Sequence, residues 1–213
     1  MKSTSWKLRG MIVLWSLLVV LGFMKLLQYT YTPTKASLID KWPSESAIAK
    51  SNLPTLLVFA HPQCPCSRAT VSGLARLMPF INNRARIAVV FYRPLDKEDS
   101  WARGNLWNQA QKIPGVETVL DHDGVEAQRF NAKVSGQTFL FNAEGNLVFS
   151  GGITAGRGHE GDSIGREMIL EFFDGKLSRD VGNGPVFGCT LAPPKATTSD
   201  GKNENKQKQF RTS

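Results

Sequence analysis

A long apolar segment near the N-terminus is the feature that most constrains this chain. The run from Met11 to Met24 contains no charged residue, and Lys25 is followed by two leucines. A helix needs roughly 20 apolar residues to cross a bilayer. A lysine at the edge of such a span can extend its ammonium group to the interface. The segment therefore predicts one transmembrane helix within residues 1–27.

The flanking charges predict how this helix is oriented. Lys2, Lys7 and Arg9 precede the apolar run, and positively charged flanks stay on the cytoplasmic side. A cleaved signal peptide is the alternative, but residues 29–36 contain no clear small-residue cleavage pattern. We therefore expect a single-pass, uncleaved anchor in the inner (cytoplasmic) membrane, with the C-terminal domain in the periplasm.

The formal net charge of +8 is concentrated at the two ends of the chain. Basic residues outnumber acidic ones in 1–27 and in 192–213, whereas the middle of the chain is close to neutral. A nucleic-acid-binding domain needs Lys and Arg gathered on a folded face. The charge pattern therefore argues against a nucleic-acid partner and leaves the membrane as the partner of the N-terminal segment.

Composition divides the rest of the chain into three parts. Residues 28–52 contain scattered Pro, Ser and Thr, which is typical of a spacer. Residues 53–191 carry alternating apolar and amphipathic runs, which predict one folded domain. Residues 192–213 are polar and almost without apolar side chains, so we predict a disordered tail.

The folded part alternates between strand and helix patterns. Short apolar, partly β-branched runs predict strands at residues 55–60, 86–92, 117–120, 138–142 and 146–150. Amphipathic stretches predict helices at residues 67–80, 100–112, 124–131 and 161–173. Strands that alternate with helices and end in a hairpin plus a helix predict an α/β fold, with a mixed central sheet flanked by helices.

The residues best suited to chemistry are Cys64-Pro65-Cys66, between the first predicted strand and helix. A helix N-terminus offers unpaired N–H groups and a partial positive charge, which lower the pKa of a thiol. His61 and Arg68 flank the motif and are expected to strengthen this effect. A disulfide between cysteines two positions apart is strained and easily reduced. The motif therefore indicates reactive thiols rather than inert buried cysteines.

The sequence around this motif carries a family resemblance. TLLVFAHPQCPCSRATVSGLARL resembles the first strand, active-site turn and following helix of the thioredoxin-like superfamily, and KVSGQTFLF resembles the strand that faces that site. HPQCPCSRAT, SGQTFLF, GGITAGRGHEGDSIGR and a late FGC are similar to the RedB-like group of membrane-anchored thioredoxin-fold proteins. The resemblance covers residues 55–191 and implies a thioredoxin-like fold with oxidoreductase activity.

The resemblance also implies roles for individual residues. Cys64 takes the place of the nucleophilic first cysteine. Ser67 stands where the second cysteine of a Cys-x-x-Cys motif would be, which makes Cys66 the substitute partner. Gln137 stands where those proteins carry a cis-proline, directly before Thr138, which we expect to face and tune the site.

Two later features add candidates. Cys189 is the odd cysteine of the chain, and in an oxidising compartment an odd cysteine suggests a resolving or intermolecular thiol. His159 lies in the glycine-rich residues 151–162, which can approach the catalytic turn, so His159 is a candidate for tuning the nucleophile. The alternative is a turn in which Asp162 or Ser163 caps the last helix.

Two functions rank highest, and a tethered interaction domain ranks last. The favoured function is an enzyme, a thiol-disulfide oxidoreductase, in which Cys64 attacks and Cys66 or Cys189 resolves. It needs no cofactor or metal and acts on a protein thiol or disulfide. The alternative is a periplasmic Cu(I)-binding thioredoxin-like chaperone, since Cys64 and Cys66 with His61 or His159 offer soft ligands.

Overall fold

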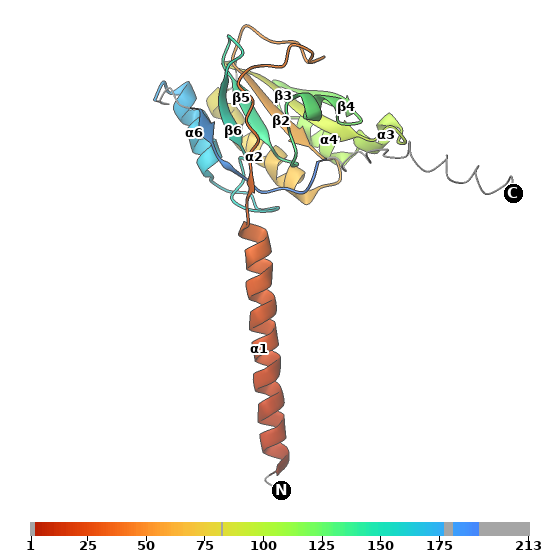
Figure 1. Cartoon of the computed structure of the whole chain (residues 1–213), viewed down its shortest axis with the longest axis vertical. Coiled ribbons are helices and arrows are strands. Elements are labelled where there is room, and N and C mark those ends of the chain that lie inside the picture. The colour runs from red at the N-terminus through yellow and green to blue at the C-terminus, as the bar shows by residue number, and fades with distance from the viewer. Residues whose placement is uncertain (1–2, 82, 177–180, 192–213) are drawn as a thin grey trace, which may run out of the picture.

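The chain forms one long helix followed by a layered domain (Figure 1). The computed structural model describes residues 3–81, 83–176 and 181–191, so the predicted tail of residues 192–213 lies outside the described part. Helix α1 (Ser3–Tyr31) projects from the domain. Its residues Trp6–Tyr31 form a span of 26 residues that is long and apolar enough to cross a membrane.

A mixed sheet lies at the centre of the domain, with the strand order β4-β3-β2-β5-β6-β7. Strands β2, β3 and β4 are parallel, β5 is antiparallel to β2 and to β6, and β7 is parallel to β6. The strands are β2 (Thr55–Ala60), β3 (Arg86–Arg93), β4 (Val116–His122), β5 (Thr138–Phe141), β6 (Leu147–Gly151) and β7 (Gly182–Asn183). A separate antiparallel pair joins β1 (Thr34–Lys35) to β8 (Pro185–Val186).

Helices cover the sheet on both faces, which confirms the predicted α/β fold with a mixed central sheet. The helices of the domain are α2 (Pro65–Ile81), α3 (Asp99–Ala102), α4 (Asn105–Gln111), α5 (Val125–Arg129) and α6 (Ile164–Phe173). Because side chains alternate along a strand, Leu56 and Val58 of β2 pack into the apolar cluster beneath α2, α4 and α6, and Leu57 and Phe59 pack into the cluster on the other face. Each such burial contributes roughly 1.5–3 kcal/mol.

The structure differs from the predicted elements in three places. The predicted helix at residues 100–112 is broken into α3 and α4, because Gly104 adopts an extended conformation as the N-cap of α4. Helix α6 begins at Ile164 because the Ser163 side chain caps it, accepting from the Arg166 N–H. Strands β1, β7 and β8 were missed, since two-residue strands have no periodicity.

The segment that connects α1 to β2 lies against the domain. Ala36 and Ile48 are buried. The Trp42 ring packs edge-on against Phe130 and Phe141, with a centroid distance of 5.1 Å in each case. Residues of this segment therefore belong to the apolar cluster on the face opposite α2.

A close approach at the start of α6 generates a prediction for stability. A Cβ at Gly165 would lie 2.1 Å from the Gly152 carbonyl oxygen and 2.8 Å from Phe149. Gly165→Ala should therefore lower the free energy of unfolding by about 1–3 kcal/mol, the usual range for overpacking. Chemical denaturation of the detergent-solubilised full chain measures it. The control is Glu167→Ala at an exposed position of α6, and equal midpoints for the two variants would contradict the clash.

Candidate functional site

The turn before α2 holds the first cysteine. Cys64 is the residue before the helix, and its carbonyl oxygen accepts from the Arg68 N–H at 3.2 Å. Pro65 is the first helical residue, where a missing N–H costs nothing. The free N–H groups of Cys66 and Ser67 therefore point to the Cys64 sulfur and donate to it. Cys64 therefore lies at a helix N-terminus, as the sequence predicted.

Hydrogen bonds to the Cys64 sulfur lower its pKa to about 4, and the largest contribution is the bond from the Cys66 thiol. The Ser135 hydroxyl donates to the same sulfur at 3.1 Å, and the two backbone N–H groups add to the effect, whereas burial opposes it. The Cys66 thiol is held in its protonated form, because donating to Cys64 raises its pKa strongly. At neutral pH the pair is therefore one thiolate and one thiol.

The third cysteine reaches this pair from the C-terminal part of the domain. Residues 186–191 run beside residues 133–135, with the Ser135 N–H bonded to the Cys189 carbonyl at 2.8 Å. The contact needs a glycine at Gly188, where a Cβ would lie 1.9 Å from the Ser135 carbonyl oxygen. The sequence pattern gives no sign of this close approach.

All three sulfur atoms lie within 4.8 Å of one another. Cys64 and Cys66 are buried, with 8% and 5% of their surfaces exposed, whereas Cys189 is exposed. The pKa of Cys189 is raised, first by partial burial and then by the negative charge of Cys64. A partner can therefore approach the cluster from the Cys189 side.

The predicted tuning residues lie in different surroundings. His61 packs against the rings of Tyr92 and Trp101, at centroid distances of 5.9 and 5.5 Å. Burial lowers the pKa of His61, and attraction to the Cys64 charge partly opposes that shift. His61 therefore lies close enough to Cys64 for their charges to interact.

The other three have no hydrogen bond to a sulfur through their side chains, within the described ranges. Arg68 is exposed and contributes only its backbone N–H to the turn. Thr138 is buried in β5 and donates to the Gly136 carbonyl oxygen at 3.2 Å. His159 stacks on Tyr31 of α1, with the ring centroids 6.1 Å apart.

Gln137, at the expected proline position, has a structural role. The described peptide bonds are all trans. The buried Gln137 side chain accepts from the Lys133 N–H at 3.1 Å and donates to the Ser37 carbonyl oxygen at 3.4 Å. Gly136 adopts φ +87° beside the Thr70 hydroxyl, where a Cβ would lie only 2.7 Å away. This turn points Ser135 at Cys64.

Sequence reasoning missed Ser135 and Gly158 as site residues. The Gly158 N–H donates to the Cys66 sulfur, which brings the glycine-rich loop over the start of α2. The available signal for Ser135 was its place in KVSGQTFLF, a polar residue just before a glycine in the segment expected to face the site. No feature of the sequence predicted the contact between Gly158 and Cys66.

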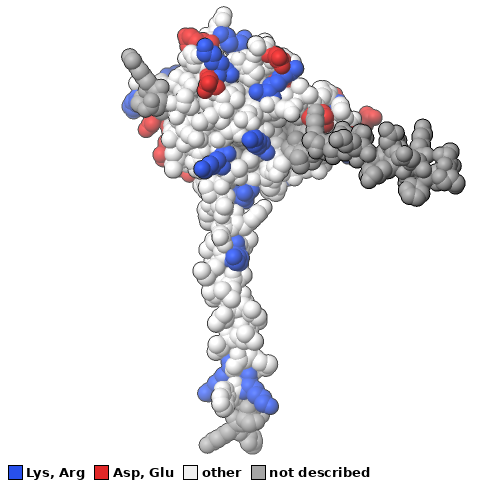
Figure 2. Space-filling view, in the orientation of Figure 1, with Lys and Arg blue, Asp and Glu red and all other residues white. Residues whose placement is uncertain are grey.

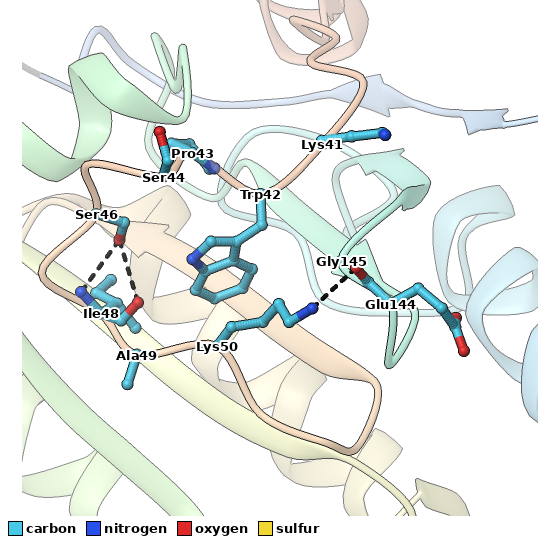
Figure 3. Close-up of a pocket in the computed structure, with 10 residues that line it drawn as sticks. All are labelled: Lys41, Trp42, Pro43, Ser44, Ser46, Ile48, Ala49, Lys50, Glu144 and Gly145. Carbon is cyan, nitrogen blue, oxygen red and sulfur yellow. Dashed lines mark hydrogen bonds between the residues drawn. The ribbon is translucent and has the colours of Figure 1, made fainter.

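A cavity of about 340 Å³ lies at the other end of β2 (Figure 3). Trp42 stands at its centre, and the Lys50 ammonium donates to the Glu144 carbonyl oxygen at 2.9 Å. Strand β2 starts beside this cavity and ends at the turn that holds Cys64. The cavity is therefore separated from the thiols by the length of the sheet.

Comparisons with known proteins bear on the fold. No family model matches the sequence, and no curated protein matches it. A hypothetical protein from Sinorhizobium meliloti superposes with a TM-score of 0.56 at 14% identity, over 75% of this chain and 97% of that one. An uncharacterized conserved protein from Geobacillus kaustophilus gives 0.52 at 14% identity, over 78% and 96%. The exposed lipoprotein thioredoxin of Streptococcus pneumoniae gives 0.43 at 15% identity, over 59% and 86%.

The fold is thioredoxin-like. Strand β2, helix α2 and strand β3 form a parallel unit. Strands β5 and β6 add an antiparallel hairpin on the other side of β2, and α6 follows. The dithiol motif lies where β2 meets α2. The superfamily resemblance found in the sequence is thereby confirmed at the level of the fold.

The hydrogen bond from Ser135 generates a prediction for reactivity. Ser135→Ala removes a donor that favours the thiolate, so the pKa of Cys64 should rise. A hydrogen bond to a charged group contributes about 1.5–3 kcal/mol, so alkylation of the reduced protein near pH 4 should slow roughly tenfold or more. Mass spectrometry of iodoacetamide labelling against pH measures this.

The matched control for this prediction is Ser150→Ala. Ser150 is also buried and donates to a carbonyl oxygen, that of Ser37, but has no bond to a sulfur. Its labelling profile should follow that of the parent protein. An unshifted profile in Ser135→Ala would show that the hydroxyl does not stabilise the thiolate.

Proposed function

We propose that this chain is a membrane-anchored, extracytoplasmic thiol-disulfide oxidoreductase of the RedB-like group, with Cys64 as its nucleophile. The observation that carries the proposal is a sulfur with a pKa of about 4 that has two protonated thiols within 4.8 Å. A thiolate is the attacking species in disulfide exchange, and a neighbouring thiol is needed to resolve the product. The cluster contains both.

The reaction proceeds in two exchanges that balance in atoms and electrons. The Cys64 thiolate attacks one sulfur of the substrate disulfide, and the other substrate sulfur leaves as a thiolate that takes up a proton. A second protein thiol then loses its proton and attacks the Cys64 sulfur, which releases the remaining substrate thiol. Two electrons pass to the substrate, and a partner dithiol protein must reduce the resulting intramolecular disulfide. With a dithiol substrate the same exchanges run in reverse.

Cys189 is the better placed of the two resolving thiols. Cys66 lies in the first turn of α2, where a bond to Cys64 requires that turn to distort. Cys189 lies on a separate segment, exposed and beside the same sulfur. We therefore assign resolution to Cys189 and assign to Cys66 the role of hydrogen-bond donor to the nucleophile.

Anchoring follows from α1. Its apolar span and the basic residues before it favour an inner-membrane helix that leaves the domain in the periplasm. The partners are then periplasmic protein thiols or disulfides, and the membrane itself.

Cysteine variants test the chemistry. Cys64→Ser should abolish insulin reduction by the full chain. Cys189→Ser should accumulate a mixed disulfide between Cys64 and substrate, visible on non-reducing gels. Cys66→Ser should keep turnover within roughly tenfold of the parent protein, since a serine hydroxyl still donates to the thiolate. Trapping in Cys66→Ser instead would assign resolution to Cys66.

One observation favours the second candidate function, Cu(I) binding. Among the described residues, the sulfur atoms of the three cysteines lie close enough together to bind one metal ion. Soft thiolates suit Cu(I). Here the third ligand would be Cys189 in place of His61 or His159. Titration of the reduced full chain with Cu(I), beside the insulin assay, separates the two functions. Tight stoichiometric binding without turnover would replace the redox proposal.

A topology experiment tests the location. Alkaline phosphatase fused after residue 191 should be active, because this enzyme forms its disulfides only outside the cytoplasm. A β-galactosidase fusion at the same position is the control and should be inactive. The opposite pattern would place the domain in the cytoplasm.

A further inference from the structure

A second cavity lies beside the thiol cluster, between the end of α1 and the segment that carries Cys189. Its volume is about 500 Å³, within the range of small-molecule sites. Its lining consists of Tyr29, Thr34, Lys133, Val134, Arg157, Gly188, Cys189 and Thr190. We name it the Cys189 groove. Of the three cysteines, only the exposed one borders it.

The Cys189 groove is cationic. Its charged lining residues are Lys133 and Arg157, and no carboxylate of the described residues lines it. Neither residue forms an ion pair with an Asp or Glu within the described ranges. Figure 2 shows separate Lys and Arg side chains on this face where α1 joins the domain, and Lys and Arg interspersed with acidic side chains at the far end of the domain. An anionic ligand would therefore meet positive charge without a competing carboxylate.

Arg157 connects the two sides of the groove, the end of α1 and the segment that carries Cys189. Its backbone N–H donates to the Thr30 carbonyl oxygen at 3.1 Å and its Nε to that of Tyr29 at 3.2 Å. Its guanidinium lies 5.0 Å from the Tyr29 ring centroid and also donates to the Gly188 carbonyl oxygen. Carbonyl oxygens accept from the Nε and from one terminal nitrogen of Arg157, and these uncharged partners leave its positive charge uncompensated.

Lys133 supplies the adaptable charge. Its side chain is exposed, and its backbone is fixed on both sides, by the Gln137 side chain and by the Leu191 N–H. The lysine therefore extends from a hydrogen-bonded backbone segment that lies directly beside the segment carrying Cys189. An ammonium group in that position can reach a carboxylate held in the groove.

We propose that the Cys189 groove binds the carboxylates of a small acidic disulfide, of the size of a peptide of a few residues, and holds its sulfur–sulfur bond beside the thiol cluster. This inference rests on the proposed function and names its substrate class. The Cys64 thiolate attacks the bound disulfide as described above, the substrate leaves as two thiols, and the protein retains an intramolecular disulfide. Lys133 is a positioning residue, since it touches the carboxylate and not the reacting sulfurs.

The test compares an acidic with a neutral disulfide on the reduced full chain in phosphatidylcholine nanodiscs. Glutathione disulfide is the acidic probe and hydroxyethyl disulfide the neutral one, and protein oxidation is followed by stopped-flow tryptophan fluorescence. Lys133→Gln should slow the reaction with glutathione disulfide by about 3- to 10-fold, as expected for one charge-assisted contact. Lys133→Glu should slow it further. Neither variant should change the rate with hydroxyethyl disulfide by more than about twofold.

Lys176→Gln is the matched control, because Lys176 is an exposed lysine that does not line the groove and is paired with Asp174. It should leave both rates unchanged. Raising the salt from about 0.01 to 1 M shortens the screening length from roughly 30 to 3 Å and should remove the preference for the acidic disulfide. Anionic lipid in the nanodiscs should not be required for that preference.

The outcomes separate the two proposals. Equal slowing of both disulfides by Lys133→Gln, or no slowing of either, overturns the groove assignment while the redox function stands. A preference seen only with anionic lipid assigns the cations to lipid headgroups and also overturns it. A protein that neither disulfide oxidises overturns the redox function and the groove assignment together.

Discussion

The site depends on the hydrogen bonds that converge on the Cys64 sulfur. A buried sulfur would ordinarily resist ionisation, because removal from water disfavours the charged form. Here two backbone N–H groups, the Cys66 thiol and the Ser135 hydroxyl donate to it, and together they outweigh burial. A helix N-terminus supplies only part of this set. The remainder comes from a turn far along the chain, so the ionised sulfur requires the folded domain.

Three segments that are distant in sequence meet at this sulfur. The turn before α2 presents Cys64, residues 133–136 present Ser135, and residues 186–191 present Cys189. The glycine-rich loop closes the group from the side of α2 through Gly158 and reaches α1 through Arg157. The end of the apolar helix is thereby in direct contact with the loop that borders the thiols.

The sequence predicted the parts of the fold that local rules determine. Strand β2 was predicted to the residue, because both of its faces are buried and its apolar run ends at a turn. The position of Cys64 before a helix was predicted because the motif lies between this apolar run and an amphipathic stretch. Cys189 was predicted as a candidate resolving thiol because it is the odd cysteine of the chain. The backbone contact that brings it to the site could not be predicted, because it depends on the close packing of Gly188, which leaves no pattern. The bond from Ser135 to Cys64 could not be predicted either, since it joins residues 71 positions apart. His61 was predicted from its proximity in sequence, and the Cys64 charge does act on its pKa, whereas the Arg68 side chain, on the other side of the motif, faces solvent.

The hydrogen bond between Cys66 and Cys64 has a consequence for the energetics of electron transfer. At neutral pH an ordinary dithiol releases two protons when it becomes a disulfide, so its midpoint potential falls by about 59 mV per pH unit, or about 30 mV per proton. In this protein Cys64 has already lost its proton, while the thiols of Cys66 and Cys189 retain theirs. Only one proton is released, and the potential falls by about 30 mV per pH unit. In the proposed reaction, each unit of acidification makes the reduced protein a stronger reductant relative to an ordinary dithiol by about 30 mV.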